Sequence, residues 1–297
     1  MKFSIWPSPT NPWEETLSTA RHAEATGWDG VWFADHFMPN AADTSGPTSE
    51  AWTTLAALAA MVPRVRIGTL VTGNTYRHPA VLAKMASNVD LISGGRLVFG
   101  LGAGWQQNEH EAYGIDFSTL GGRMRRLEEA CQLIISLFEN DKTDFQGKHY
   151  QLKDAPLAPK PARRPPLLIG GGGEKVTMRI AAQYADEWNV WGSPEVLIQK
   201  QTVLDDHCHY LGRDPRAIKR SAQALLLISD DREAVERMRG AGRPVIAGTV
   251  SDVKQVVKGY QDAGVDELII PGFNLGTGDR IRSTMDTFIN EVAPEFR

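Results

Sequence analysis

Residues 166–184 read PLLIGGGGEKVTMRIAAQY, and this stretch contains the unit from which the fold is built. The apolar residues that open it are typical of a short buried strand, and a run of glycines ends that strand at 170–173. Residues 175–184 then have the apolar spacing of a helix. A strand that passes through glycines into a helix is one strand–helix unit of an α/β protein.

The same unit recurs along the whole chain. Strands are predicted at 2–6, 30–34, 66–72, 96–102, 166–173, 187–191, 221–229 and 267–272. Helices are predicted at 13–26, 49–61, 80–92, 121–138, 175–184, 194–211, 231–239, 251–263 and 278–291. Strands that alternate with helices run parallel, and a set of about eight pairs favours a closed (β/α)8 TIM barrel. An open, doubly wound sheet is the alternative.

One stretch interrupts this alternation. Residues 140–166 are polar and become rich in proline towards their end. The stretch is too long for a connection from helix to strand, so we expect an insertion on the surface of the barrel. No flexible linker separates two halves of the chain, and residues 1–297 are therefore interpreted as one domain.

Composition narrows the class of protein. The chain has 297 residues, with 42% hydrophobic and 23% charged residues and a net charge of −4, which suits a soluble barrel that acts on a small molecule. The negative charge argues against nucleic acid or an anionic membrane as partner. The N-terminus has no apolar signal segment, and Cys131 and Cys208 are too few for a disulfide framework. A cytoplasmic location is expected.

The residues predicted to follow the strands share a chemistry. The active site of a barrel of this kind lies at the C-terminal ends of the strands. The aromatic and amide residues at these ends are Trp6, Asn74, Trp188, Asn189, Trp191, Phe273 and Asn274. Aromatic faces and amide groups suit a flat heteroaromatic ligand with a polar edge.

Two glycine-rich stretches follow strands. Residues 170–173 precede a helix, whose free N–H groups and dipole would attract a phosphate. Glu174 is unfavourable beside such an anion, and Lys175 could offset it; a loop without a ligand is the alternative. The pattern GLGAG at 100–104 lacks the spacing of a dinucleotide fingerprint. There the glycines would let a ligand ring approach the backbone, or else only form a corner of the barrel.

Asp35 and His36 end the second predicted strand. Because neighbouring side chains at a strand end point in different directions, we expect one to face the pocket and the other to support the loop or meet a ligand edge. Histidine is a natural proton donor or acceptor near neutral pH. The commoner alternative for such a pair is a capped loop with a surface imidazole. No zinc-binding motif is present, and His207 and His209 do not face each other on a helix, so no metal site is predicted.

The sequence resembles the bacterial luciferase-like family, and within it the oxidoreductases that use the deazaflavin coenzyme F420. The resemblance covers nearly the whole chain and is carried by the motifs WFADH (32–36), GTLVTGNTYRHPAVLAK (68–84), SGGRLVFGLGAGWQQNEHEAYG (93–114), PPLLIGGGGEKVTMRIAAQYADEWNV (165–190) and DAGVDELIIP (262–271). It implies a (β/α)8 barrel with an insertion, usually as a homodimer.

The resemblance also implies roles for particular residues. Asp35 and His36 would contact the deazaflavin ring and give or take a proton. The family usually has a non-proline cis peptide against the ring, which falls here at Leu70–Val71, with Thr72 following it.

The remaining cofactor contacts are implied in the same way. Gly102, Ala103 and Gly104 would line the pyrimidine side of the ring, and Asn108 would hydrogen-bond one of its carbonyl groups. Gly171, Gly172 and Gly173 would hold the phosphate of the coenzyme.

One position departs from the family pattern. The sugar-phosphate dehydrogenases of the family have a glutamate where Trp105 stands here. Loss of that carboxylate argues against sugar oxidation and favours a narrower pocket for a flatter, less polar substrate.

The function expected from these observations is hydride transfer between C5 of F420 and a small organic substrate, with His36 handling the proton. If His36 did not, bulk water or Glu109 would be the next proton source. An FMN-dependent monooxygenase is the first alternative, because a phosphate site does not distinguish the coenzymes. A flavin-binding protein without turnover is the second.

Overall fold

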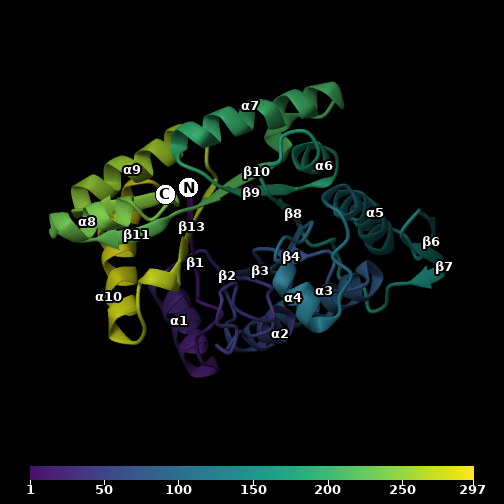
Figure 1. Ribbon diagram of the computed structural model, residues 1–297, viewed down its shortest axis with the longest axis horizontal. Helices are drawn as coiled ribbons and strands as arrows, with labels where there is room; N and C mark the ends of the chain where they lie inside the picture. Colours follow the sequence, from purple (N-terminus) through teal and green to yellow (C-terminus); the bar gives the residue numbers. More distant parts are fainter.

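A computed structural model describes residues 1–297. Its main sheet is a closed barrel of parallel strands, and Figure 1 shows helices outside it. The barrel strands are β1 (Lys2–Trp6), β2 (Gly30–Phe33), β3 (Arg66–Thr69), β5 (Leu97–Gly102), β8 (Leu167–Gly170), β9 (Glu187–Trp191), β10 (Lys219–Gln223) and β13 (Glu267–Pro271). Pairing of β3 with β5, at Ile67 and Leu97, closes the ring. The predicted TIM barrel is confirmed, and the open sheet is excluded.

The helices that follow the strands form the outer layer. They are α1 (Trp13–Thr26), α2 (Ala51–Met61), α3 (Pro79–Ser93), α5 (Leu120–Glu139), α6 (Thr177–Tyr184), α7 (Pro194–Tyr210), α9 (Val250–Asp262) and α10 (Asp279–Thr287). Their ends follow from local sequence: α1 stops at Gly27, which has a left-handed φ of 88° that suits glycine. Thr249 and Asp252 form a capping box that begins α9. No helix in the chain has the length and apolar character needed to cross a membrane.

One predicted strand is divided in the structure, and one strand was not predicted. The strand expected at 221–229 is broken at Ala224 into β10 and β11 (Leu225–Ile228). β11 leaves the barrel and pairs in parallel with β12 (Val245–Gly248) after α8 (Arg232–Arg239). The continuous apolar run conceals the break, and β12 is too short to be recognised from its pattern.

The insertion forms an antiparallel hairpin outside the barrel, beside α5 (Figure 1). Its strands are β6 (Lys142–Gln146) and β7 (Gln151–Pro156). The carboxylate of Glu129, on α5, accepts the backbone N–H groups of the hairpin turn at 2.8–3.1 Å. Tyr150 accepts a hydrogen bond of 3.1 Å from the side chain of Asn74, so the insertion reaches the loop that follows β4 (Thr72–Gly73).

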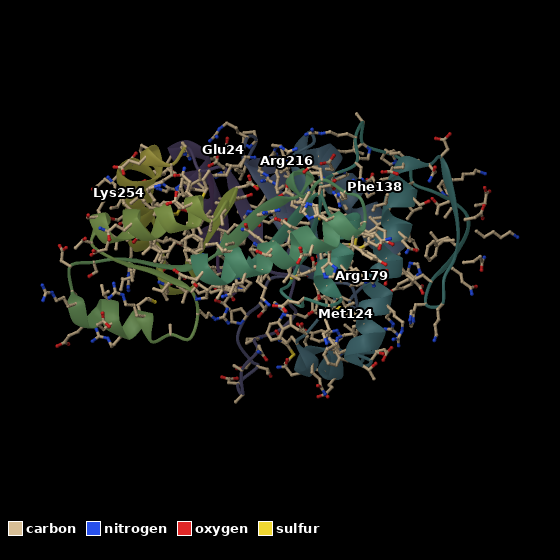
Figure 2. The ribbon with its side chains drawn as sticks, turned by 90° about the horizontal axis from the view of Figure 1, so that it is seen from above. Glu24, Met124, Phe138, Arg179, Arg216 and Lys254 are labelled. Atoms are coloured by element: carbon tan, nitrogen blue, oxygen red, sulfur yellow. The ribbon has the colours of Figure 1, made fainter.

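The outer helices are joined by polar as well as apolar contacts. Figure 2 shows Arg179 on α6 among the side chains near α5. Its guanidinium group pairs with both carboxylate oxygens of Glu128, at 2.7 and 2.9 Å. Phe138 lies in the apolar core beneath these helices. The ends of the chain also meet, since the Met1 ammonium group donates to the carbonyl of Phe296 at 2.6 Å.

A buried ion cluster fills the N-terminal end of the barrel. Arg66 donates to Glu267 at 2.6 Å and to Glu187 at 2.7 and 2.9 Å, and each of the three starts a strand or lies beside its start. Trp32 donates its indole N–H to Glu267 at 2.9 Å. These contacts pair the buried charges with one another. The candidate functional site is therefore sought at the opposite, C-terminal end of the barrel strands.

Candidate functional site

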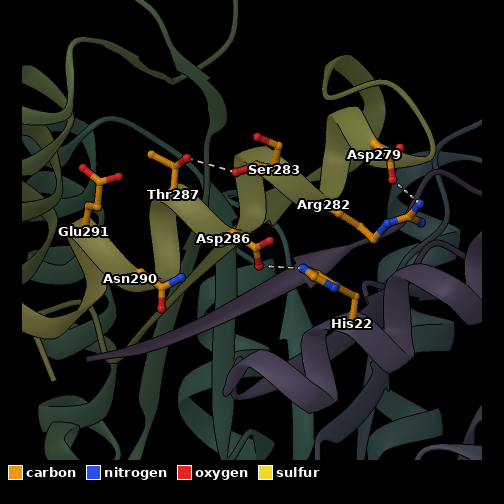
Figure 3. A pocket seen from close by; sticks show the side chains of 8 residues that line it. All are labelled: His22, Asp279, Arg282, Ser283, Asp286, Thr287, Asn290 and Glu291. Carbon is orange, nitrogen blue, oxygen red and sulfur yellow. Dashed lines mark hydrogen bonds and ion pairs between the residues drawn. The ribbon is translucent and has the colours of Figure 1, made fainter.

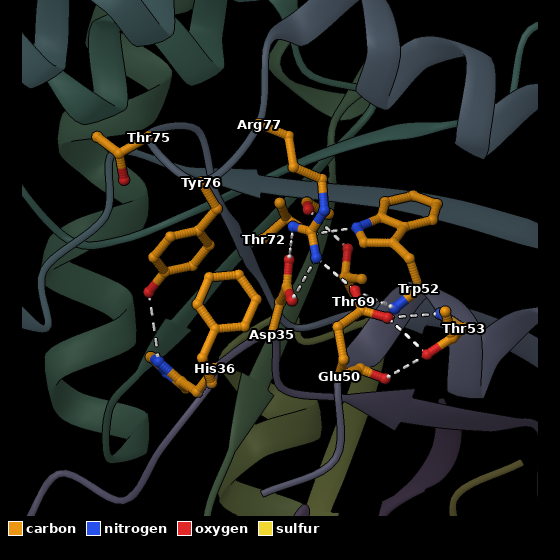
Figure 4. A network of polar contacts seen from close by, with 12 residues as sticks. Asp35, His36, Glu50, Trp52, Thr53, Thr69, Thr72, Thr75, Tyr76 and Arg77 are labelled. Carbon is orange, nitrogen blue, oxygen red and sulfur yellow. Dashed lines mark hydrogen bonds and ion pairs between the residues drawn. The ribbon is translucent and has the colours of Figure 1, made fainter. Parts of the chain in front are cut away.

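The residues at the C-terminal end of β2 form two sets of polar contacts, one around Asp35 and one around His36 (Figure 4). The Asp35 side chain is fully buried and pairs with the Arg77 guanidinium group at 2.7 and 3.2 Å. Arg77 also donates to Glu50. Burial raises the pKa of the Asp35 carboxyl, although the charge of Arg77 opposes this. The structure therefore shows Asp35 supporting the loop, while its contact with a cofactor ring stays a prediction.

His36 points to a different partner. Its Nδ1 atom lies 2.9 Å from Oε1 of Glu109, and its side chain is 20% exposed. The Glu109 side chain is fully buried on α4 (Gln107–Tyr113), and it also accepts hydrogen bonds from the Phe37 backbone N–H, at 2.8 Å, and the Tyr76 hydroxyl. The sequence indicates Glu109 only as a substitute proton source, because the helix that carries it is too short to be recognised. Tyr76 lies in a loop, and nothing in its neighbourhood marks it.

The charge state of this cluster follows from its hydrogen bonds. Burial raises the pKa of the Glu109 carboxyl, but the bonds from His36, Phe37 and Tyr76 outweigh it and hold that pKa below its usual range. Burial and the bond to Glu109 raise the pKa of the Tyr76 phenol, so it remains a neutral donor. An ionised carboxylate only accepts. Nδ1 of His36 must therefore carry its proton, which leaves Nε2 free to exchange one.

Trp105 lies beside this histidine. Its ring is edge-on to the imidazole with the centroids 5.4 Å apart, and 60% of its surface is exposed. A bulky aromatic ring thus stands next to the group that would exchange a proton, which fits the expectation of a narrowed pocket.

The peptide bond between Leu70 and Val71 is cis, as the resemblance implied. It separates β3 from β4, so the predicted strand 66–72 is interrupted there. The Val71 side chain occupies the space that Gly102 and Gly170 leave. A Cβ atom added to Gly102 would lie 2.8 Å from the Val71 side chain, and one added to Gly170 would lie 2.9 Å from it. At Gly100 a Cβ atom would collide with the carbonyl oxygen of Thr69.

The glycines at the end of β5 have a packing role. Gly100 and Gly102 leave room for the Thr69 carbonyl and the Val71 side chain, and Gly104, after the strand, has a φ of 79°. Ala103 is half-buried between them. Contact of Thr72, which is buried, or of Gly102, Ala103 and Gly104 with a bound ring stays a prediction.

Asn108 already has partners within the chain. Its Nδ2 donates to the carbonyl of Pro39 at 3.3 Å, and its Oδ1 accepts the backbone N–H of Glu109 at 2.9 Å. The side chain thus helps to begin α4 and to hold the loop after β2. Nδ2 carries a second N–H that has no partner within the chain, and its bond to a ring carbonyl stays a prediction.

The glycine run after β8 forms a loop rather than the first turn of a helix. α6 begins at Thr177, two residues later than predicted, and the Gly173 carbonyl accepts the N–H of Met178 at 3.0 Å. Gly171 has a φ of 129°, which suits glycine. The charge at the loop comes from Lys200 on α7.

Lys200 joins the two parts of this loop. Its ammonium group donates to the Gly172 carbonyl at 3.0 Å and to the Glu174 carboxylate at 2.7 Å. Glu174 is thus paired by Lys200 and not by its neighbour Lys175, with which the sequence analysis had associated it. Lys200 lies 28 residues beyond Gly172, and no local motif marks it.

Aromatic residues line another side of the mouth. Trp6 lies 6.2 Å from Trp191 and 4.8 Å from Phe273 between ring centroids, and Arg243 lies 4.8 Å from the centroid of Trp191. Asn189 and Asn274 are bonded within the chain, to Ser221 and to the Leu226 carbonyl. Trp188 donates to the carbonyl of Gly171.

Four buried polar atoms at the strand ends have no partner within the chain: Nε1 of Trp6, Oδ1 of Asn74, Oε1 of Gln223 and Oδ1 of Asn274. Buried polar groups are normally hydrogen-bonded. Such atoms at the C-terminal end of a barrel fit a ligand with a polar edge. Gln223 was not among the predicted site residues, because it lies inside an otherwise apolar run.

A hollow lies outside the barrel, between α1 and α10 (Figure 3). It is lined only by polar side chains, His22, Asp279, Arg282, Ser283, Asp286, Thr287, Asn290 and Glu291. His22 and Asp286 are paired at 2.7 Å. The hollow has no aromatic or apolar wall to hold a ring, so the barrel mouth is the better candidate.

The chain is similar to several known proteins. The chain is 28% identical over 288 residues to the F420-dependent glucose-6-phosphate dehydrogenase of Kineococcus radiotolerans, covering 84% of each chain. Its fold is similar to an F420-dependent secondary alcohol dehydrogenase solved with an F420–acetone adduct, with a TM-score of 0.87, 22% identity and full coverage of both chains. A monooxygenase from Streptomyces bottropensis gives a TM-score of 0.84 at 20% identity, again over both whole chains.

A family model described as luciferase-like monooxygenase matches residues 1–279. The match spans every strand of the barrel and both polar contacts at the end of β2. The chain therefore belongs to the luciferase-like monooxygenase family.

Proposed function

We propose that this protein is a coenzyme F420-dependent oxidoreductase that transfers a hydride between deazaflavin C5 and a small organic substrate. The observation that carries the proposal is the His36–Glu109 contact at the barrel mouth. It presents a histidine with a fixed proton on Nδ1 and a free Nε2. The F420-dependent dehydrogenase from Kineococcus supports the choice of coenzyme.

The residues at the mouth fit a deazaflavin. The loop Gly171–Gly173 has no side chains beyond Cα, and the ammonium group of Lys200, which is paired with Glu174, lies beside it, so the loop would leave room for a phosphate within reach of a cation. The unpaired Oδ1 atom of buried Asn74 offers an acceptor to the N–H edge of a ring. Leu70, Val71 and the glycines after β5 would lie against the ring face. When bound, F420 would supply the hydride donor or acceptor.

The protein's own contribution is a proton. His36 would take one on Nε2 as an alcohol is oxidised, or give one from Nε2 as the reverse reaction proceeds. In either direction the Glu109 carboxylate accepts the Nδ1–H bond and stabilises the cationic imidazolium. The exposed side of Trp105 would limit access of water and of bulky substrates to Nε2.

An FMN-dependent monooxygenase is the second candidate, favoured by the description of the family. A phosphate held by Gly171–Gly173 would serve FMN equally well. A flavin-binding protein without turnover would not need the buried carboxylate that orients His36.

The experiment is a pair of titrations, with oxidised F420 and with FMN, read by the absorbance and fluorescence of each cofactor. Tight binding of F420, followed by its reduction with an alcohol or by oxidation of separately prepared reduced F420 with a ketone, would support the proposal. Binding of FMN alone would assign the protein to the monooxygenases, and binding without turnover on any substrate would leave the third interpretation.

A further inference from the structure

The inward faces of β1, β9 and β10 end in a common layer at the barrel mouth. Side chains two residues apart lie on the same face of a strand. Ser4 points into the barrel, where it bonds Glu267, and Trp6 shares its face. Asn189 and Ser221, which are register partners on the adjacent strands β9 and β10, bond each other at 2.9 Å. The next residues on those faces are Trp191 and Gln223, so Trp6, Trp191 and Gln223 form what we call the upper layer.

The polar groups of the upper layer have no partner within the chain. Gln223 is only 4% exposed, and its side chain forms no hydrogen bond within the chain. Trp6 is 7% exposed, and its indole N–H has no acceptor. Leaving such groups buried and unpaired destabilises the folded state. A bound ligand that pairs with them would remove this cost.

The chemistry of these groups defines their complement. The indole N–H of Trp6 can only donate, so the ligand must offer an acceptor there. The carboxamide of Gln223 both donates and accepts, and its unpaired Oε1 requires a donor. A carboxylate could not supply that donor. It would also be buried beside three uncharged side chains, which is unfavourable without a paired cation.

We infer that the upper layer binds a flat, uncharged substrate through an amide edge, in which a carbonyl stands next to an N–H, as in a lactam or an imide. The carbonyl accepts from the indole N–H of Trp6, the N–H donates to Gln223, and the ring of Trp191 packs on a face of the ligand. This inference names the substrate class of the proposed oxidoreductase and rests on that function.

The rival site is the rim. The guanidinium group of Arg243 lies over the ring of Trp191 at 4.8 Å and forms no ion pair or hydrogen bond within the chain. It is exposed and suits an anion. A preference for carboxylates that depends on Arg243 would therefore contradict the inference.

The test uses ligands that need not react. Calorimetric titration of the full-length protein, with and without F420, compares 2-pyridone, N-methyl-2-pyridone and benzoate. We expect 2-pyridone to bind at least about tenfold more tightly than its N-methyl derivative. Gln223→Leu should abolish this preference. Trp6→Phe should weaken both pyridones by a similar factor and keep the preference, because both retain the carbonyl.

Stability provides an independent readout. Because Gln223→Leu removes a buried amide without partners, it should raise the Tm of the ligand-free protein. A lower Tm would show that the amide is a structural group, and the inference would fail. It would fail equally if the two pyridones bound alike, if Gln223→Leu left their ratio unchanged, or if benzoate bound best and Arg243→Gln abolished that binding.

The two proposals can fail separately. Selectivity for 2-pyridone does not depend on turnover, so it would survive in a protein that failed to bind F420. Conversely, F420 binding and turnover with no pyridone selectivity would retain the oxidoreductase and remove the amide subsite.

Discussion

Nδ1 of His36 lies 2.9 Å from Oε1 of Glu109, although the two residues are 73 positions apart in the chain. The carboxylate is fully buried and has three donors, whereas the imidazole reaches the surface of the mouth. Glu109 therefore determines which nitrogen of His36 is free. His36 and Glu109 act together in the reaction proposed here.

Replacement of His36 by Asn tests the proton role. Asn has a similar polarity but does not titrate, and general acid–base help is worth roughly 10²–10⁴-fold. Turnover with F420 should fall by that order, while the cofactor dissociation constant should change little. Steady-state rates and a fluorescence titration measure the two quantities. Full turnover with an unaltered pH profile would assign the proton to water or to Glu109.

Replacement of Glu109 by Gln tests the positioning role. Gln still accepts a hydrogen bond from Nδ1 but removes the negative charge that stabilises the imidazolium. We expect turnover to fall, because the cation formed by His36 loses its counter-charge. Cofactor binding serves as the control. Turnover equal to that of the wild type would show that the charge of Glu109 has no part in the reaction.

Much of the architecture could be read from the sequence, because strand and helix periods leave a direct pattern in it. This pattern predicts the barrel and the insertion, whereas the position of the cis bond follows only from the family resemblance. The partners of the predicted residues were not, because Arg77, Glu109 and Lys200 reach Asp35, His36 and Gly172 only through the closed barrel. A single sequence records spacing along the chain and contains no signal for these approaches across the mouth.

The Asp35–Arg77 pair should contribute strongly to stability. Arg77→Met leaves the buried carboxylate of Asp35 without its cation, which costs about 3 kcal/mol in the free energy of unfolding at pH 7. Burial already raises the folded-state pKa of Asp35, and loss of Arg77 raises it further. The cost of Arg77→Met is therefore present at pH values above the raised pKa of Asp35 in the variant. It shrinks as the pH falls through that pKa and Asp35 is protonated.

Urea unfolding at pH 7 and pH 5 checks this prediction. The gap between wild type and Arg77→Met should narrow at the lower pH. Asp35→Asn combined with Arg77→Met should recover part of the loss, because no unpaired charge remains. A gap that is equal at both pH values would mean that Asp35 stays ionised without Arg77.

The loop after β8 should hold the cofactor phosphate. Gly172→Asp places a carboxylate where the anion would approach, and we expect cofactor affinity to fall at least tenfold, or about 1.4 kcal/mol. A Cβ atom at this position would lie 2.9 Å from Val190, so Gly172→Ala is the matched control for the steric effect. Lys200→Gln should also weaken binding, because it removes the cation beside the loop. Fluorescence titration at low and high salt measures all three variants, and the losses in Gly172→Asp and Lys200→Gln should diminish as salt screens the charges. Equal affinities for Gly172→Asp and Gly172→Ala would show that no anion binds at this loop.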